Sequence, residues 1–275
     1  MPELPEAETI VRDLAPRLAG RTLSHPQLTH TDVLRGVSRR GLTRALDGAR
    51  VADLTRRAKH LVLRLRGGRR AVFRLGMTGA LLVYDRPLTA AERRYAVLRA
   101  TLDDGGVLVF RDVRRLGAIY LLDEPGWRSY TGRIGYEPLG ADFDLAAFRD
   151  VLRGSTQAVK KVIMDQRKLA GVGNIYANEA LFLARVDPSR PANRVTPDAA
   201  GRLYRAVRRV LAQAITGRGT TVRDYRTGTG GRGAFQFSLQ VYGREGEPCV
   251  RCRTRLATTH AIDQRATTFC WRCQE

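Results

Sequence analysis

All four cysteines of this 275-residue chain lie within its last 27 residues, in the order Cys249-x2-Cys252-x17-Cys270-x2-Cys273. Two Cys-x2-Cys pairs at this separation are typical of four thiolates that hold one structural zinc ion, and their clustering argues against dispersed disulfides. Between the pairs, residues 256–259 and 267–269 predict the two strands of a hairpin whose tip carries Arg265. Because so short a segment cannot build its own core, the metal would supply its folding energy. The alternative is a zinc clip with no contact role.

The charge of the chain predicts a polyanionic partner. It has 48 Lys and Arg against 27 Asp and Glu, a formal net charge of +21. The excess is spread evenly: residues 1–140 hold 25 basic and 15 acidic side chains, and residues 141–275 hold 23 and 12. Two basic halves indicate two lobes that face one nucleic acid, whereas the alternative is an Arg-rich chain without such a partner.

Lysine is rare in this chain. Only four of the 48 basic residues are Lys, and Lys59 is the only one before Lys160, which makes it a candidate for amine chemistry. The alternative for Lys59 is an ordinary solvated charge.

The sequence shows no signal peptide and no apolar run long enough to span a bilayer. We therefore expect a cytoplasmic protein without a membrane partner.

The chain begins Met1-Pro2-Glu3-Leu4-Pro5-Glu6. If Met1 is removed, Pro2 carries a free secondary amine, and an α-amino group with a pKa of about 8 is partly neutral near pH 7. Attack of this amine on a sugar C1′ would give a cationic iminium, an electron sink for bond breaking. Glu3 could hold or deliver a proton beside the same carbon. The alternative is a plain lead into a helix whose buried stripe includes Ile10 and Leu14.

Secondary structure is expected to change character along the chain. Seven short apolar or alternating runs separated by Gly turns predict a β-sandwich or barrel: 51–54, 61–65, 71–75, 80–84, 97–102, 107–110 and 118–122. A Gly- and Pro-rich stretch at 124–140 predicts a linker. Three helices are then expected at 143–152, 157–164 and from Thr196 to about Ile215, the last with a buried face at Ala199, Leu203, Val207, Val210 and Ala214.

Two turns in the strand region carry unusual residues. One places Met77 between Gly76 and Gly79, and the other holds Arg114, Arg115 and Leu116. Such apolar side chains usually belong to a core. Together with Arg, however, they could fill the hole that an enzyme leaves when it extrudes a base from DNA.

Two glycine-containing segments allow close backbone approach. In Gly171-Val172-Gly173-Asn174, Asn174 could cap a helix from Ile175 whose first amides bind phosphate, or the segment could be a structural helix–turn–helix joint. Residues 217–233 are rich in Gly and also contain Arg218, Arg223, Arg226 and Arg232. The segment has too few apolar residues to be expected to pack against a core. It is predicted to be either a mobile lid over a site or a disordered connector.

Motifs spread over the whole chain resemble one protein family. They are Met1–Thr9, Arg57-Ala58-Lys59-His60-Leu61, Leu75–Gly79, Gly171–Glu179, Gln240–Arg244 and Gln264–Thr267 with the four Cys, in family order. This set resembles bacterial formamidopyrimidine-DNA glycosylase. The resemblance implies an α+β multidomain fold: an N-terminal helix and β-sandwich (1–125), a linker (126–140), a helix–two-turn–helix domain (141–233) with the lid loop 217–233, and a zinc finger (240–275).

The resemblance also implies roles for individual residues. Pro2 matches the Schiff-base nucleophile and Glu3 the proton donor. Lys59 matches a residue of β-elimination and phosphate binding, and Arg265 one of phosphate binding and δ-elimination. The expected DNA contacts are Met77, Tyr95, Arg114, Arg115, Leu116, Lys160 and Asn174, and the expected cofactor is one structural Zn²⁺ on the four Cys.

Several positions depart from the family pattern. Leu116 stands where Phe is usual, Val113 replaces a Pro, and Tyr95 replaces a DNA-contacting His. Another family Lys corresponds to Ser155 or Thr156, although Lys160 is retained. Two additional residues lie in the zinc hairpin. None of these differences affects the four expected catalytic residues.

The predicted function is a monomeric, bifunctional glycosylase and AP lyase of base-excision repair that acts on double-stranded DNA. It would remove oxidised purines, such as 8-oxoguanine and formamidopyrimidines, through a Pro2 imine followed by β,δ-elimination. The alternatives are an endonuclease VIII-like enzyme for oxidised pyrimidines, an AP lyase with little glycosylase activity, and a non-catalytic protein that binds damaged DNA.

Overall fold

A computed structural model describes residues 2–221 and 225–275. Met1 and Arg223, both named above, lie outside the described residues. The chain divides into two compact units. The first comprises the residues up to Gly132 together with Gly217–Ala234, and the second comprises Arg133–Thr216 and Phe235–Glu275. No helix in the described part of the chain combines the length and the apolar character needed to cross a bilayer.

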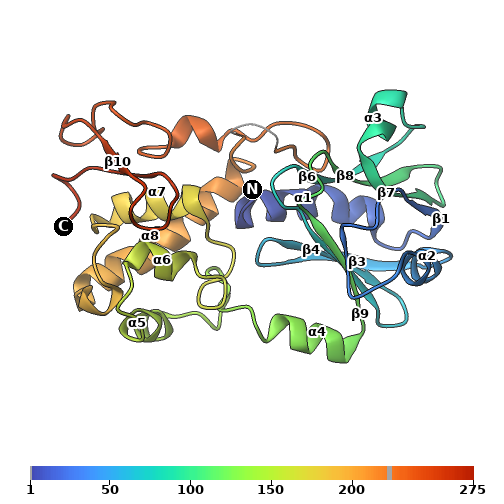
Figure 1. Ribbon diagram of the computed structural model, residues 1–275, viewed down its shortest axis with the longest axis horizontal. Helices are drawn as coiled ribbons and strands as arrows, with labels where there is room; N and C mark the ends of the chain where they lie inside the picture. The colour runs from blue at the N-terminus through green and yellow to red at the C-terminus, as the bar shows by residue number, and fades with distance from the viewer. Residues whose placement is uncertain (1, 222–224) are drawn as a thin grey trace. The chain divides into compact units, whose positions relative to one another are not determined.

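The first unit is a β-sandwich bordered by helices (Figure 1). One sheet has the strand order β1-β7-β8-β6, with β1 (Leu23–Leu28), β7 (Ala96–Leu102), β8 (Val107–Asp112) and β6 (Gly79–Tyr84). The other has the order β2-β9-β5-β4-β3, with β2 (Leu34–Arg35), β9 (Ala118–Leu122), β5 (Arg70–Arg74), β4 (His60–Leu65) and β3 (Val51–Arg57). All pairs are antiparallel except β2 with β9. The seven predicted strands and the predicted sandwich are therefore confirmed.

The core lies between the two sheets and α1 (Leu4–Leu18). Phe73 of β5 and Phe110 of β8 meet across the sandwich with ring centroids 5.5 Å apart. The predicted stripe of α1, including Ile10 and Leu14, is buried in the same core. Each such side chain contributes about 1.5–3 kcal/mol on burial, so this face fixes α1 on the sandwich.

Three further helices of the first unit are α2 (Arg39–Leu46), α3 (Ala90–Arg94) and α4 (Glu124–Thr131). Helix α4 occupies part of the segment that the sequence predicted as a linker. It forms because Asp123 caps it by accepting a hydrogen bond from Gly126 N at 2.9 Å, and because its aromatic face packs on β9. Tyr130 of α4 lies 5.1 Å from Tyr120 of β9 between ring centroids. Gly and Pro here mark a helix start rather than an irregular linker.

The Gly-rich loop groups with the first unit rather than with the helical domain to which the sequence assigned it. The prediction that it is too poor in apolar residues to pack is wrong for its described residues. Tyr225 is 8% exposed and belongs to the sandwich core. Glycine permits this close packing: a Cβ on Gly228 would come within 2.8 Å of Leu14 Cγ, and one on Gly233 within 2.2 Å of Gly219 O.

The second unit is helical and carries the cysteine hairpin. Its elements are α5 (Leu145–Arg153), α6 (Val159–Met164), α7 (Asn174–Ala184), η1 (Ala192–Arg194), α8 (Pro197–Thr216), η2 (Phe235–Ser238), β10 (Ala257–Thr259) and β11 (Thr267–Phe269). The three predicted helices and the predicted hairpin are confirmed, with Ala257 paired to Phe269. The five predicted core positions of α8 are all buried.

A buried carboxylate joins α7 to the segment that leads into the hairpin. Glu179 accepts backbone hydrogen bonds from Gln240, Val241 and Tyr242 at 2.8–3.0 Å. Burial raises the pKa of the Glu179 carboxyl, and the three amides oppose that shift. The family motif Gln240–Arg244 is thus held through its backbone, which explains why its side chains offered no clue to this contact.

Candidate functional site

Pro2 and Glu3 are buried at the start of α1, where Glu3 is the N-cap residue. The backbone N–H of Glu3 donates to Glu6 Oε2 at 2.8 Å. This bond fixes the backbone immediately after Pro2, so the expected nucleophile and proton donor are anchored to the first turn of a helix that the core holds. A site on a helix that is fixed in this way is positioned more rigidly than one on a loop.

Glu6 is a functional candidate that the sequence analysis described only as part of the opening motif. Its side chain is buried, and its second oxygen, Oε1, accepts from Thr220 N at 2.7 Å. The Tyr225 hydroxyl also donates to the carbonyl oxygen of Glu6, at 3.4 Å. Glu6 therefore ties the backbone beside the expected nucleophile to the Gly-rich loop. The spacing Glu3-x-x-Glu6 signals the bond to Glu3, while nothing in the sequence signals the bond to Thr220.

Lys59 lies in the turn between β3 and β4, with 7% of its surface exposed. The preceding Ala58 has φ +54°, and Arg56 donates to its carbonyl at 3.0 Å. Arg56 Nε also pairs with Glu8 Oε2 of α1 at 2.9 Å. Burial alone would raise the pKa of Glu8, but hydrogen bonds from Arg12 and Arg56 hold it below its usual value. The Lys59 turn is thereby fastened to the helix that carries Pro2 and Glu3.

His60 anchors the same turn from its other side. Its Nδ1 lies 3.1 Å from the hydroxyl of Tyr130 on α4. Burial raises the pKa of Tyr130, so its phenol stays protonated at neutral pH. The helix found in the predicted linker thus contacts a neighbour of Lys59.

The two predicted wedge turns of the first unit pack on each other. Thr78 Oγ1 donates to Asp112 Oδ1 at 2.5 Å and accepts from Arg114 N at 3.1 Å. Asp112 Oδ2 accepts from Gly117 N at 2.7 Å. This buried pair, which the sequence analysis missed, leaves Met77 and Leu116 about half exposed. Neither apolar side chain is part of the core, so the alternative of ordinary core residues is wrong for both.

Arg115 and Tyr95 have protein partners in the same unit. Arg115 has φ +50° and pairs with Asp32 at 2.6 Å. The Tyr95 ring has the guanidinium carbons of Arg94 and Arg111 each 5.3 Å from its centroid. Its carbonyl accepts from Asp112 N at 3.1 Å, which connects it to the wedge turns. The structure thus brings Tyr95 and the wedge turns together.

In the second unit, Asn174 does not cap α7 as predicted. Gly173 is the N-cap, and Asn174 is the first helical residue. Its Nδ2 instead donates to the carbonyl of Ala266 in the hairpin, at 3.0 Å. The Asn174 side chain therefore contacts the hairpin rather than its own helix. Because Ala266 lies 92 residues further along the chain, local spacing cannot reveal this contact. Arg265, at the hairpin tip, is exposed.

Lys160 is fully buried near the start of α6. Its Nζ donates to Thr267 Oγ1 at 2.6 Å and to Asp263 Oδ1 at 3.2 Å. This placement does not support the predicted direct DNA contact, because no part of the side chain reaches solvent. An ammonium group this buried is instead satisfied within the protein.

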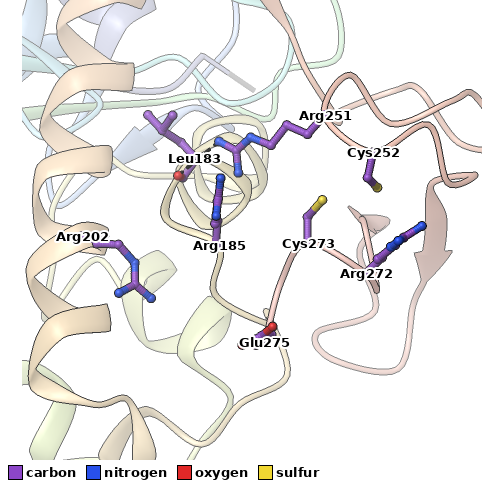
Figure 2. Close-up of a pocket in the computed structure, with 8 residues that line it drawn as sticks. All are labelled: Leu183, Arg185, Arg202, Arg251, Cys252, Arg272, Cys273 and Glu275. Carbon is purple, nitrogen blue, oxygen red and sulfur yellow. Dashed lines mark hydrogen bonds between the residues drawn. The ribbon is translucent and has the colours of Figure 1, made fainter.

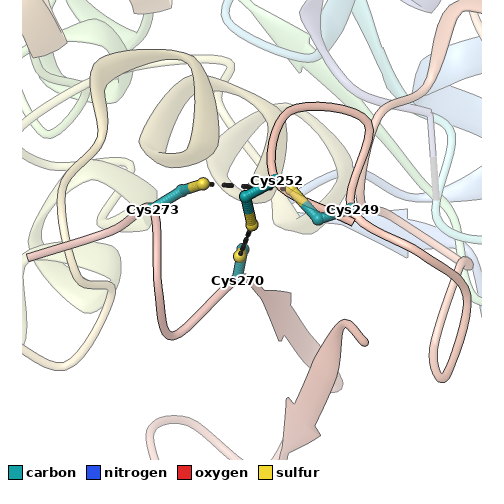
Figure 3. Close-up of side chains that lie close together, drawn as sticks. All are labelled: Cys249, Cys252, Cys270 and Cys273. Atoms are coloured by element: carbon teal, nitrogen blue, oxygen red, sulfur yellow. Dashed lines mark hydrogen bonds between the residues drawn. The ribbon is translucent and has the colours of Figure 1, made fainter. Parts of the chain in front are cut away.

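The four cysteines form a candidate metal centre in the second unit (Figure 3). All four Sγ atoms lie within 4.8 Å of one another, with Cys249–Cys273 at 4.0 Å and Cys252–Cys270 at 3.4 Å. Tetrahedral ligands with Zn–S bonds of about 2.3 Å lie about 3.8 Å apart. The donor set and its spacing therefore fit a zinc ion, and four thiolates leave no open position for catalysis.

An arginine-lined cavity of about 660 Å³ borders this centre (Figure 2). Its lining includes Cys252, Cys273 and four arginines: Arg185, Arg202, Arg251 and Arg272. Arg251 donates to Phe182 O at 2.9 Å, and Arg202 donates to Ala184 O at 3.1 Å. These two arginines satisfy carbonyls at the end of α7, and the four positive side chains would offset the negative charge of thiolates that held a metal ion. The cavity therefore belongs to the metal centre.

Comparison with known proteins assigns both units to one family. Residues 1–119 match the Formamidopyrimidine-DNA glycosylase N-terminal domain, and residues 134–226 match the Formamidopyrimidine-DNA glycosylase H2TH domain. The chain is 43% identical to the formamidopyrimidine-DNA glycosylase of Thermomicrobium roseum, covering 100% of this chain and 99% of that protein. It is 40% identical to that of Chloroflexus aurantiacus, with 100% and 98% covered.

Solved structures agree. The crystal structure of the MutM (Fpg) protein from Thermus thermophilus is 39% identical with a TM-score of 0.87, covering 99% of this chain and 98% of that one. The Lactococcus lactis Fpg in complex with N7-benzyl-Fapy-dG DNA is 31% identical with a TM-score of 0.90, and both chains are covered completely. By domains, full-length identity and fold, the chain belongs to the formamidopyrimidine-DNA glycosylase family.

Proposed function

We propose that this chain removes oxidised purines from double-stranded DNA and then cleaves the strand by β,δ-elimination. Membership of the family makes it a DNA glycosylase of base-excision repair. The finer assignment is supported by one observation above all: Pro2 and Glu3 are buried at the anchored start of α1, and the Arg56–Glu8 pair fastens the Lys59 turn to that helix.

The chemistry follows from these groups. The Pro2 amine, freed by removal of Met1, attacks C1′ as the damaged base leaves, and Glu3 supplies the proton that opens the sugar. The resulting iminium acidifies C2′, so loss of a C2′ proton expels the 3′ phosphate and a second elimination expels the 5′ phosphate. Lys59 and Arg265 neutralise the departing phosphates. The zinc ion is structural, since its four ligands are all protein thiolates.

The remaining predicted residues recognise DNA. Met77, Arg114 and Leu116 would fill the space that the extruded base leaves, and their exposure suits that role. Arg115, within the second wedge turn, and Tyr95, beside it, would contact the DNA backbone. Asn174 would act at the start of α7, where a helix N-terminus favours phosphate. A monomeric state and a cytoplasmic location remain predictions.

The substrate class draws support from the relatives. Structures of the Lactococcus lactis protein hold DNA containing Fapy-dG and DNA containing an abasic site. The first is a damaged purine, and the second is the product of base removal. We propose that this chain also binds DNA that contains a damaged purine and DNA that contains an abasic site.

Borohydride trapping tests the proposal. The protein is incubated with duplex DNA carrying 8-oxoguanine opposite cytosine, beside Pro2→Gly and Glu3→Gln variants. We expect a covalent complex mapped to the N-terminal peptide for the unmodified protein and none for Pro2→Gly. Trapping only on abasic DNA would leave an AP lyase without this substrate, and faster excision of oxidised pyrimidines would favour the endonuclease VIII-like alternative. Tight binding without any trapping would indicate a non-catalytic protein.

A further inference from the structure

The buried ammonium group of Lys160 connects α6 to the tip of the cysteine hairpin. It donates to Thr267 and Asp263 of the hairpin, at 2.6 and 3.2 Å. None of the Lys160 side chain is exposed, and the Asp263 side chain is 11% exposed. A buried cation is tolerated only when its partners stay in place, so this contact restricts the conformation of the tip.

The same two partners also hold the backbone of Arg265. Asp263 Oδ1, which accepts from Lys160, also accepts from Arg265 N at 3.3 Å. The Thr267 hydroxyl accepts from Lys160 and donates to Arg265 O at 3.4 Å. Gln264, between Asp263 and Arg265, has φ +62°, a conformation that needs support from its surroundings. The Arg265 side chain itself extends from this framework into solvent.

We infer that Lys160 is a positioning residue that fixes the backbone on both sides of Arg265 and so sets where its guanidinium meets a phosphate. This inference rests on the proposed role of Arg265 in the second elimination. It replaces the predicted contact between Lys160 and DNA with an indirect effect, and it depends on Asp263 at the hairpin tip.

Other contacts keep the hairpin attached without Lys160. Asn174 Nδ2 donates to Ala266 O, and Asn178 Oδ1 accepts from Thr268 N at 2.9 Å. The metal centre is formed by cysteines at the base of the hairpin. Loss of the Lys160 charge should therefore disturb the tip while leaving the zinc site and the attachment to α7 in place.

The test compares Lys160→Met, Asp263→Asn and Arg265→Gln on duplex DNA with one abasic site. Lys161→Met is the matched control, because Lys161 is the exposed next residue of α6. Each variant is assayed for zinc content, borohydride trapping, and the ratio of δ- to β-elimination product. We expect Lys160→Met to keep one zinc and normal trapping, and to lower the product ratio on the order of tenfold or more, as misplacement of a catalytic group does.

The ratio of δ- to β-elimination product for the double variant Lys160→Met/Arg265→Gln should be no lower than for Arg265→Gln alone, because both changes act through the Arg265 guanidinium. A product ratio for Lys160→Met equal to that of Lys161→Met overturns the inference. If Lys160→Met loses zinc, Asp263→Asn decides, and an unchanged ratio there also overturns it. A normal ratio for Arg265→Gln instead refutes the proposed role of Arg265, so the two failures are distinguishable.

Discussion

Glu6 and Thr220 are 214 positions apart in the sequence, yet Thr220 N donates to Glu6 Oε1 at 2.7 Å in the buried interior of the first unit. The other carboxylate oxygen receives the N–H of Glu3 at 2.8 Å. One side chain thus joins the backbone beside the proposed nucleophile to the Gly-rich loop.

Glu6→Gln should weaken both the fold and base removal. The Gln side chain has one acceptor oxygen, whereas the Glu6 carboxylate accepts from both Glu3 N and Thr220 N. The NH₂ group of Gln would therefore face one of these two N–H donors. We expect a loss of about 1–3 kcal/mol in the free energy of unfolding, measured in urea, because a buried donor loses its acceptor. Base excision should slow in the same variant. Glu245→Gln, at an exposed carboxyl of the second unit, is the control and should change neither quantity.

Tyr130→Phe removes the hydroxyl that hydrogen-bonds with His60 while keeping the aromatic ring. We expect a loss of about 1 kcal/mol in unfolding free energy and a slower lyase step, because the Lys59 turn loses a contact. Tyr120→Phe is the matched control, since its hydroxyl has no hydrogen bond among the described residues. Equal lyase rates for the two variants would contradict the proposed link to Lys59.

The raised pKa of Tyr130 also predicts an alkaline effect. Above pH about 10, the usual tyrosine pKa, the unfolded chain releases this proton while the folded protein keeps it. The stability of the unmodified protein should therefore fall with rising pH more steeply than that of Tyr130→Phe. Urea unfolding of both proteins between about pH 8 and 11 measures the difference, which should be constant up to about pH 10.

Met77→Ala should impair base removal without affecting stability. The side chain is 47% exposed, so its truncation should change the unfolding free energy by less than about 0.5 kcal/mol. Excision of 8-oxoguanine from duplex DNA should slow, because the vacated stack loses its apolar filler. Single-turnover assays would show this, with Val113→Ala as the control at another exposed apolar residue of these turns. An unchanged rate would remove Met77 from the wedge.

Metal affinity should rise with pH. Without metal, burial raises the pKa of the Cys270 thiol and raises that of Cys273 to about 12. Zinc must displace these protons, so lowering the pH should favour release to a chelator. Competition with a chromophoric chelator at about pH 6, 7 and 8 measures the trend after correction for the chelator's own protonation. A flat profile would contradict four-thiolate ligation.

Elements that depend on neighbouring residues could be predicted from the sequence, whereas elements that depend on contacts with distant residues could not. The seven strands were recognisable because alternation and Gly turns are local, and the cysteine hairpin followed from ligand spacing. Strand β1 was missed because its sequence LSHPQL contains Pro26 and a register shift between Ser24 and Gln27, and its partner β7 lies far along the chain. Helix α4 was missed because its Gly and Pro resemble those of a linker.

The site divides in the same way. Pro2, Glu3, Lys59 and the cysteines could be proposed from the sequence because each belongs to a short motif. Glu6, Asp112 and Thr78 were not assigned a role, because each has a hydrogen-bond partner far along the chain: Thr220 for Glu6, and Thr78 and Asp112 for each other. For Lys160 the family resemblance implied a DNA contact, whereas the structure pairs its buried ammonium group with Asp263, 103 residues further along the chain, which local sequence could not reveal.

The return of Gly217–Ala234 to the first unit has a consequence for how this chain can be made. Tyr225, which completes the sandwich core, is synthesised after α5, α6, α7 and α8. A ribosome must therefore release most of the second unit before the first can close, which reverses the usual expectation that the N-terminal domain folds first. For the same reason, a gene fragment ending near residue 132 would encode a sandwich with part of its interior uncovered.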